Sequence, residues 1–222
     1  MANPQQTPPP SVAVFWEPGF PEIQGCGITR DILQQALANL TVHFLSEQEL
    51  IARLNTDRFD LFINPFGSAF PKHAWPAILK YLLSGGNWLN VGGVPLSRPV
   101  VRDGSSWRAE PHQTSYHKRL GITQSFPVTG FYGDIGTGVD GVILGLGKTE
   151  EVYALYIRLS STDKEPDEAG SDGPREAVLK PVMFCMGPGG PGAKAAAVIQ
   201  IDRLLREFAG GRWVLANFRG SI

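Results

Sequence analysis

The sequence has few of the residues that build metal and redox centres. Only two cysteines, Cys26 and Cys185, occur among 222 residues, and they lack the paired spacing of zinc or dithiol motifs. None of the four histidines pairs with another at i, i+4, the spacing at which one helix face holds a metal. We therefore expect neither a metal site nor a cofactor, and the two cysteines leave the cellular compartment unknown.

The sequence also lacks a charge imbalance and a long apolar run. Its 20 basic and 21 acidic residues give a net charge of −1, which argues against the basic surface typical of proteins that bind nucleic acid or anionic lipid. No stretch approaches the roughly 20 apolar residues of a spanning helix, and the N-terminus lacks the regions of a signal peptide. We expect a soluble chain with no nucleic-acid or membrane partner, extracytoplasmic if it is a fragment of a secreted enzyme.

Glycine and proline are abundant, with 26 and 18 residues. Together they exceed ordinary usage but stay below the roughly 25–30% typical of disordered chains, so a packed domain with many loops is expected. Residues 1–10 end in a proline run that favours an extended tail or linker. Residues 11–222 are predicted to form a single domain, with a β-rich insertion at about 94–195 and an acidic solvent loop at 162–176.

Strands and helices alternate through the first half of the domain. Thr29 and Ser46 are predicted N-caps, and Ser46 forms a capping-box pattern with Glu49. Strands are predicted at 11–16, 41–45, 59–64 and 88–91, of which those at 11–16 and 59–64 are expected to be buried. Helices are predicted after Thr29, after Ser46 and at 73–83. Such alternation predicts a parallel sheet with right-handed crossovers. The expected fold class is α/β, a three-layer, doubly wound, mostly parallel sheet of the flavodoxin-like kind with a β-rich C-terminal elaboration.

The second half has the pattern of a β-rich extension. Strands are predicted at 139–146, 152–159, 179–186, 197–201 and 212–218, and a helix at 202–208. We interpret them as antiparallel strands and the closing edge of the main sheet. The glycine-rich segment 187–194 is predicted to be a hairpin loop, because Ala193 and Ala195 stand where a phosphate-binding loop needs other residues.

Ligands of open α/β sheets bind beyond the carboxyl ends of the parallel strands. The residues that follow the predicted strands are therefore candidates for a ligand cleft, together with one histidine from a later segment. The candidates are Glu17, Phe20, Cys26, Asn64, Phe66, Gly67, Ser68, Gly92, Gly93 and His117.

Several segments carry a resemblance to a known family. Besides the N-terminal strand, they read NPFGSAFP from Asn64, YLLSGGNWLNVGG from Tyr81 and YHKRLGI from Tyr116. Over Ser11–Ile122 the chain resembles the class I glutamine-amidotransferase-like superfamily. It is most similar to the non-amidotransferase branch, which includes trehalose-utilisation-type proteins and modules attached to glycoside hydrolases.

The resemblance also shows what this sequence is missing. In active members of that superfamily, the strand matching 88–91 leads into a nucleophile elbow, G-x-C-x-G, whose cysteine position falls here on Gly93. The family's late His-x-Glu pair has no counterpart, because no histidine follows His117. A cysteine amidohydrolase needs a thiolate beside its base. The resemblance therefore implies that the chain has no catalytic residues and does not hydrolyse glutamine.

Two side chains near the strand ends leave a catalytic alternative open. Cys26 lies between glycines, where a small residue in a tight turn is favoured over a nucleophile that meets a histidine. Glu17 ends a buried strand, where accepting backbone N–H groups from the next loop is favoured over catalysis. No second carboxylate can be matched to it as a glycosidase pair. Cys185 is expected in the core, and Trp107 is expected to stack on a sugar or to bury at a protein interface.

These observations favour a non-catalytic module that serves a carbohydrate-active enzyme as an accessory, oligomerisation or substrate-positioning domain. The expected partners are a neighbouring catalytic domain in the same or a larger chain, a second copy of the chain, or a carbohydrate. The alternative is a stand-alone hydrolase or a sugar-binding protein that uses the cleft around Glu17.

Overall fold

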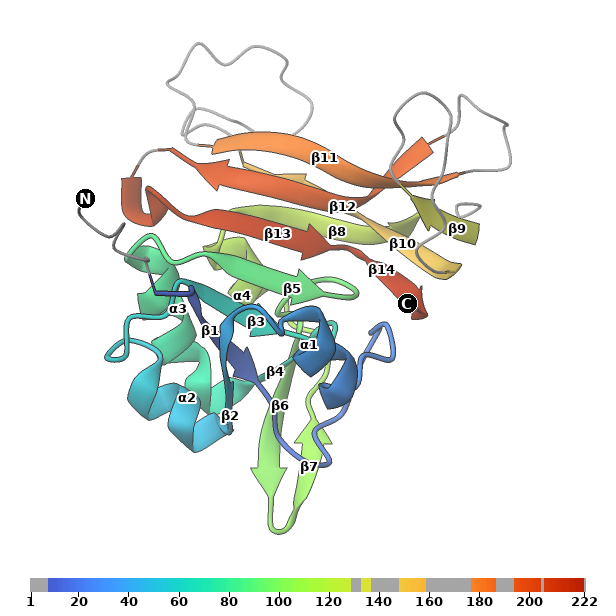
Figure 1. Cartoon of the computed structure of the whole chain (residues 1–222). Coiled ribbons are helices and arrows are strands. Elements are labelled where there is room, and N and C mark those ends of the chain that lie inside the picture. The colour runs from blue at the N-terminus through green and yellow to red at the C-terminus, as the bar shows by residue number, and fades with distance from the viewer. Residues whose placement is uncertain are drawn as a thin grey trace, which may run out of the picture.

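The computed structural model describes residues 8–128, 133–136, 148–158, 177–186, 194–204 and 206–221. Within them the fold is mixed α/β, built on one large sheet that joins a parallel half to an antiparallel half (Figure 1). The strand predicted at 139–146, the acidic loop predicted at 162–176 and most of the loop predicted at 187–194 lie outside the described residues.

The parallel half of the sheet follows the predicted alternation. Its strands lie in the order β2-β1-β3-β5-β13. Counted along the chain this is the order 2-1-3-4-5, which is that of flavodoxin-like sheets. The strands are β1 (Ser11–Phe15), β2 (Thr41–Leu45), β3 (Leu61–Asn64), β5 (Trp88–Val91) and β13 (Arg212–Ala216). A strand from the C-terminal end thus joins four from the first half.

Antiparallel strands extend the sheet beyond β13. They are β8 (Ile122–Val128), β9 (Gly133–Gly136), β10 (Lys148–Ile157), β11 (Ala177–Met186), β12 (Lys194–Arg203) and β14 (Phe218–Ser221). Asn217 separates β13 from β14, so that β13 pairs with β12 while β14 pairs with β10. This half therefore folds back, and β8 and β10 lie behind β12 and β13 in Figure 1.

A second, small sheet was not expected from the sequence. β4 (Ala69–Pro71) pairs in parallel with β6 (Arg98–Asp103), which forms a hairpin with β7 (Ser106–Ala109). The hairpin projects away from the large sheet, at the bottom of Figure 1.

The predicted caps start the first two helices. In α1 (Arg30–Ala36) Thr29 accepts a hydrogen bond from the backbone of Ile32, and in α2 (Glu47–Arg53) Ser46 and Glu49 form the capping box. A single 3₁₀ turn, η1 (Lys72–Ala74), leads into α3 (Trp75–Leu83), and the short α4 (Ser115–Arg119) precedes β8.

The helix predicted at 202–208 is wrong. β12 continues through Arg203, and the remainder is one 3₁₀ turn, η2 (Arg206–Phe208). The carboxylate of Asp202 accepts hydrogen bonds from Lys180 and Arg212, side chains of the neighbouring strands. Because Asp202 and Arg203 pair with β11, and Asp202 also pairs with β13, strand pairing overrides the local helical pattern.

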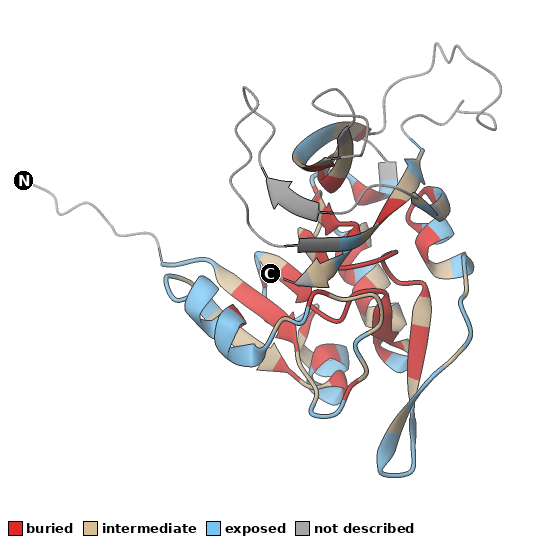
Figure 2. Ribbon diagram, turned by 90° about the vertical axis from the view of Figure 1, so that its right-hand side faces the viewer, coloured by how far each residue is buried: buried red, intermediate tan, exposed pale blue. Residues whose placement is uncertain are grey.

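Core packing differs on the two faces of β1. Ala13 and Phe15 belong to the cluster that contains Leu50 of α2 and Ile78 of α3, whereas Val14 packs with Leu33 of α1. Figure 2 shows the buried residues concentrated along the central strands. Burial of each large apolar side chain contributes roughly 2 kcal/mol, so this packing fixes where the strand ends meet.

Candidate functional site

The turn after β5 stands where the resemblance places a nucleophile elbow. Gly92 and Gly93 both have positive φ, +99° and +54°, a backbone region that L-residues rarely adopt. The N–H of Gly92 donates to Ala216 O at 2.8 Å, and the N–H of Gly93 donates to Phe218 O at 2.9 Å. Backbone donors that would be free at a reactive turn are therefore used to attach β13 and β14.

Position 93 has no room for a side chain. A Cβ atom on Gly93 would lie 2.7 Å from Cβ of Gln24 and closer still to Oγ of Ser68. Real Cβ atoms essentially never approach other atoms within 3.0 Å. The space that a nucleophile would need is thus filled by two side chains from other loops.

Ser68 accepts a hydrogen bond from a further backbone donor of this turn, the N–H of Val94. Its hydroxyl is fully buried, donates to Oε1 of Gln24 and accepts the N–H of Val94 at 2.9 Å. In nucleophile elbows the N–H of the residue after the nucleophile helps to stabilise the oxyanion. Here that N–H belongs to Val94, and Ser68 already occupies it.

Two buried asparagines hold the strand ends together. Nδ2 of Asn90 donates to Gly67 O at 3.1 Å and to Gly92 O at 3.0 Å. Nδ2 of Asn64 donates to Oδ1 of Asn90 at 2.8 Å and to Ala69 O at 3.0 Å. Both side chains are 1% exposed, so each hydrogen bond satisfies a group that water does not reach.

Glu17 is tied to its neighbours at the end of β1. Its Oε2 accepts the N–H of Glu47 in the first turn of α2 at 2.9 Å, and its Oε1 accepts from Arg102 at 2.7 Å. Glu17 thus accepts a backbone N–H group, as the sequence suggested, but from the first turn of α2 rather than from the next loop. The guanidinium of Arg102 also lies over the Trp107 ring, 4.3 Å from its centroid.

The aromatic candidates pack together beside Glu17. Phe20 and Phe66 are nearly buried, and their ring centroids lie 4.9 Å apart. Phe20 and Trp107 form a T-shaped pair, with ring centroids 5.1 Å apart. Since Arg102 covers a face of Trp107, the ring that was expected to stack on a sugar or to bury at an interface already has intramolecular partners.

Cys26 is a buried thiol in this structure. Its side chain is 2% exposed, and burial, reinforced by the charge of Glu22, raises the pKa of the Cys26 thiol to about 12. A nucleophilic cysteine needs the opposite shift. Cys185 is fully buried in the same apolar cluster.

We predict that neither thiol reacts with a disulfide reagent while the chain is folded. In a Cys185→Ser variant, Cys26 should react at pH 8 on the order of a thousandfold more slowly than in the unfolded chain, because so little thiolate is present. The measurement is the rate of chromophore release with and without denaturant. Stoichiometric labelling of the folded chain within seconds would show that Cys26 is accessible and activated.

His117 lies in α4 and is fully buried. Neither ring nitrogen has a hydrogen-bond partner among the described residues. Burial, helped by His112 and Lys118, lowers the pKa of His117 to about 4 from 6.5. No hydrogen bond joins it to Cys26, Glu17 or Ser68 in the described part of the chain, so it is not paired with any of them as a base.

The buried imidazole predicts acid sensitivity. Between about pH 6.5 and pH 4 the unfolded chain binds a proton at His117 that the folded chain does not, so stability falls as pH falls through this window. We expect His117→Met to remove on the order of 2 kcal/mol of the loss between pH 7 and pH 4.5. Denaturant titrations at both pH values measure it, and Gln48→Met, at an exposed residue of α2, is the control that should leave the loss unchanged.

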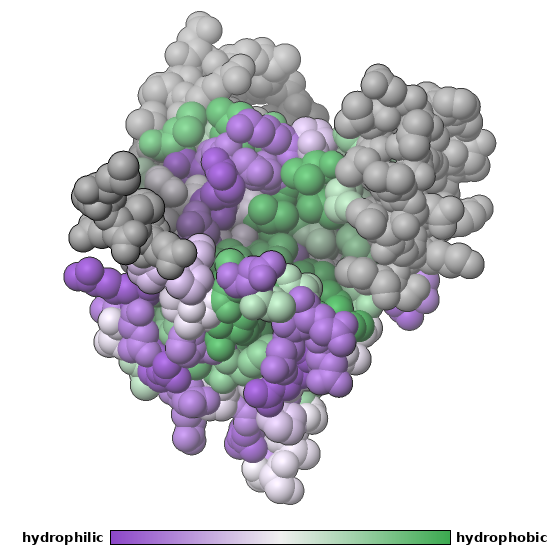
Figure 3. Space-filling view, viewed as in Figure 1, coloured by the Kyte–Doolittle hydropathy of each residue, from purple (hydrophilic) through white to green (hydrophobic). Residues whose placement is uncertain are grey.

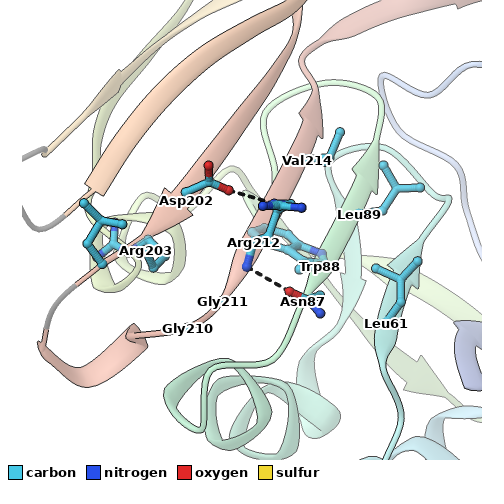
Figure 4. Close-up of a pocket in the computed structure, with 11 residues that line it drawn as sticks. Leu61, Asn87, Trp88, Leu89, Asp202, Arg203, Gly210, Gly211, Arg212 and Val214 are labelled. Carbon is cyan, nitrogen blue, oxygen red and sulfur yellow. Dashed lines mark hydrogen bonds and ion pairs between the residues drawn. The ribbon is translucent and has the colours of Figure 1, made fainter. Parts of the chain in front are cut away.

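A groove of about 670 Å³ lies near the other ends of the same strands. Three apolar side chains line it, from β3, β5 and β13 respectively: Leu61, Leu89 and Val214 (Figure 4). Arg212 also lines it and forms an ion pair with Asp202 at 2.8 Å. Apolar surface gathers at the centre of this face of the molecule, with polar side chains around it (Figure 3). Sequence reasoning, directed to the carboxyl ends, missed this surface.

Two residues that close the strand-end turn were also missed. Gln24 lies in a loop without periodicity, and its contact with Gly93 depends on tertiary folding alone. The sequence could have indicated Asn90, because a polar residue inside the apolar strand at 88–91 must find buried partners.

Over the described residues, no group of three or more metal-ligating side chains is found, and no helix is long and apolar enough to cross a membrane.

No family model and no curated protein matches the sequence. Similar solved structures include a β-galactosidase from Bacillus circulans sp. alkalophilus, at 10% identity and a TM-score of 0.48, with 96% of this chain and 29% of that chain covered. A ThuA-like protein from Bacteroides uniformis is 11% identical with a TM-score of 0.43, covering 99% and 86%. A GMP synthase subunit from Thermoplasma acidophilum is 7% identical with a TM-score of 0.40, covering 96% and 85%.

This chain thus spans less than a third of the β-galactosidase. With identities of 11% or less and TM-scores below 0.5, these similarities leave the function to be inferred from the residues of the chain itself.

Proposed function

We propose that this chain is a non-catalytic member of the class I glutamine-amidotransferase-like superfamily, a three-layer doubly wound domain that serves a carbohydrate-active enzyme as an accessory module. One observation carries the non-catalytic part. The nucleophile position, Gly93, is closed by Gln24 and Ser68, and the backbone donors of Gly92, Gly93 and Val94 are all used internally.

The other candidate groups offer no substitute chemistry. Glu17 is held by Glu47 and Arg102, and Cys26 is a buried thiol with a pKa of about 12. A general acid or nucleophile needs a reactive atom that is free to meet its substrate. Both carboxylate oxygens of Glu17 already accept hydrogen bonds, and the Cys26 thiol is buried.

The accessory role is supported by the sequence pattern and by the groove on the sheet face. The pattern resembles modules attached to glycoside hydrolases, which implies a catalytic domain as the neighbour. The floor of the groove, formed by Leu61, Leu89 and Val214, offers an apolar surface of the kind that binds another protein surface. A second copy of the chain or the catalytic domain would cover it.

Light scattering and calorimetry test the accessory role together. We expect the isolated chain either to self-associate at micromolar concentration or to bind a saccharide from a panel of galactosides, mannosides and trehalose. If it self-associates, Leu89→Glu should weaken the association by placing a charge in the groove, while Ile51→Glu, at an exposed position on α2, should not. A strict monomer that gives no binding heat with any saccharide would contradict both the oligomerisation role and the substrate-positioning role.

A further inference from the structure

Strand β2 ends the large sheet on its parallel side. Among the described strands it pairs only with β1, over five consecutive residues and without a register shift. At the start of β2 the N–H of Thr41 donates to Pro10 O, and at its end the carbonyl of Leu45 accepts from the N–H of Trp16. Backbone groups of successive residues point to opposite sides of a strand, so those of Thr41, His43 and Leu45 point to β1.

The backbone groups of Val42 and Phe44 therefore point away from β1, along the open edge of β2. No hydrogen bond between the backbones of the described residues, outside the strand pairing itself, uses the N–H or the C=O of either residue. Both side chains are only half-buried. Two N–H donors and two carbonyl acceptors thus face outward, which is the pattern on which a further strand pairs.

The strands at the opposite end of the large sheet carry features that prevent such pairing (Figure 1). β8 contains Pro127, which has no N–H to donate to a further strand, and β14 has only four residues and a register shift where it meets β10. The sequence of β2 contains no proline, glycine, lysine or arginine. Because folded proteins protect the edges of their sheets against association, the unprotected edge of β2 indicates that another strand covers it.

The open edge of β2 is complementary to itself. When two β2 strands run antiparallel about a two-fold axis at His43, Val42 of one copy lies opposite the partner's Phe44. Residues paired in this way exchange both of their N–H···O=C bonds, so the two symmetry-related pairs satisfy every outward donor and acceptor of both copies. The same arrangement places an aromatic ring beside a β-branched side chain, a combination that stabilises neighbouring strands.

We propose that two copies of this chain associate edge to edge through β2, with Val42 and Phe44 of each copy paired across a two-fold axis at His43. The two large sheets then form one continuous sheet. The contact closes at two copies, because it uses the same edge of each chain. The edge is separate from the groove that Leu89 lines, so the accessory role can hold without this dimer.

Disulfide cross-linking of His43→Cys tests the register of the dimer. Residues opposite each other in a non-hydrogen-bonded pair have Cα atoms about 4.5 Å apart, within the range of a disulfide. Thr41→Cys, at an exposed position of the same strand, is the control, because the two copies of position 41 would lie more than about 12 Å apart. With oxidised glutathione, we expect His43→Cys to form a covalent dimer at least about tenfold faster than Thr41→Cys. The wild type should form none, because Cys26 and Cys185 are buried.

Val42→Pro tests the hydrogen bonds of the dimer. It deletes an N–H that points away from β1, so the chain keeps its own strand pairing, and the unfolding temperature of the variant checks this. Val42→Thr retains both the N–H and the branched shape and is the matched control. In sedimentation equilibrium we expect Val42→Pro to raise the dissociation constant of the dimer at least about tenfold and Val42→Thr to leave it unchanged.

Leu89→Glu separates this dimer from association through the groove. In the His43→Cys background it should leave the rate of cross-linking unchanged, because the groove is not part of the β2 contact. Loss of the cross-link in that variant would assign the association to the groove and overturn the proposal. No cross-link at position 43, equal rates at positions 41 and 43, or a dissociation constant that Val42→Pro does not change would overturn it as well.

Discussion

Gly93→Ala is expected to lower the free energy of unfolding by about 3 kcal/mol. Two costs add at this position. The backbone has a φ of +54°, and a Cβ would overlap both Gln24 and Ser68. Because Ser68 is fully buried and its hydroxyl is bonded on both sides, it cannot move away without losing hydrogen bonds. Urea titration of the wild type and the variant measures the difference.

Gly104→Ala separates the two costs. Gly104, in the β6–β7 turn, has a φ of +61°, close to that of Gly93, but a Cβ there would meet nothing within 4 Å. Its loss should be about 1 kcal/mol, from backbone strain alone. Equal losses at the two glycines would mean that the space over Gly93 is open, which contradicts the closed site.

Asn90→Ala is expected to lower stability by about 3 kcal/mol. The variant leaves Nδ2 of Asn64 without Oδ1 of Asn90 and removes the Asn90 donor from Gly92 O. It leaves Gly67 O with only the long hydrogen bond from Asn64, at 3.5 Å. These groups lie where water does not reach, so the full cost of unpaired polar groups applies. Thermal and urea unfolding of the purified variant provide the measurement.

Asn87→Ala is the matched control for that loss. Asn87 precedes β5 and also bridges two segments, donating to Asp60 O and accepting from the N–H of Arg212, each at 2.9 Å. It is only half-buried, so water replaces the lost bonds and the cost should be about 1 kcal/mol. A larger loss at Asn87 than at Asn90 would show that the asparagine pair does not hold the strand ends.

Local signals in the sequence were sufficient for the parallel half of the fold. Ser46 and Glu49 form their capping box, and the strand predicted at 88–91 occupies those same residues. These features depend on neighbours in the chain or on burial at both faces, which a sequence pattern records directly. The prediction of a helix at 202–208 was wrong because the partners of Asp202, Lys180 and Arg212, lie on neighbouring strands that the local sequence does not reveal.

The closed site could be predicted only in part. The empty nucleophile position at Gly93 follows from the residue itself. That Gln24 and Ser68 fill the space, and that Val94 has no free N–H, depends on contacts between segments more than 25 residues apart. The small β4-β6-β7 sheet escaped prediction because β4 has only three residues and β7 is largely exposed, so neither leaves a clear apolar pattern in the sequence.

A turnover assay of the wild-type chain tests the closed, non-catalytic site most directly. The substrates are L-glutamine, nitrophenyl glycosides and a nitrophenyl ester, with Glu17→Gln and Cys26→Ser assayed beside the wild type. We predict that no substrate is converted faster by the wild type than by either variant or by the buffer. Conversion by the wild type that is lost in Glu17→Gln or in Cys26→Ser would contradict the non-catalytic assignment.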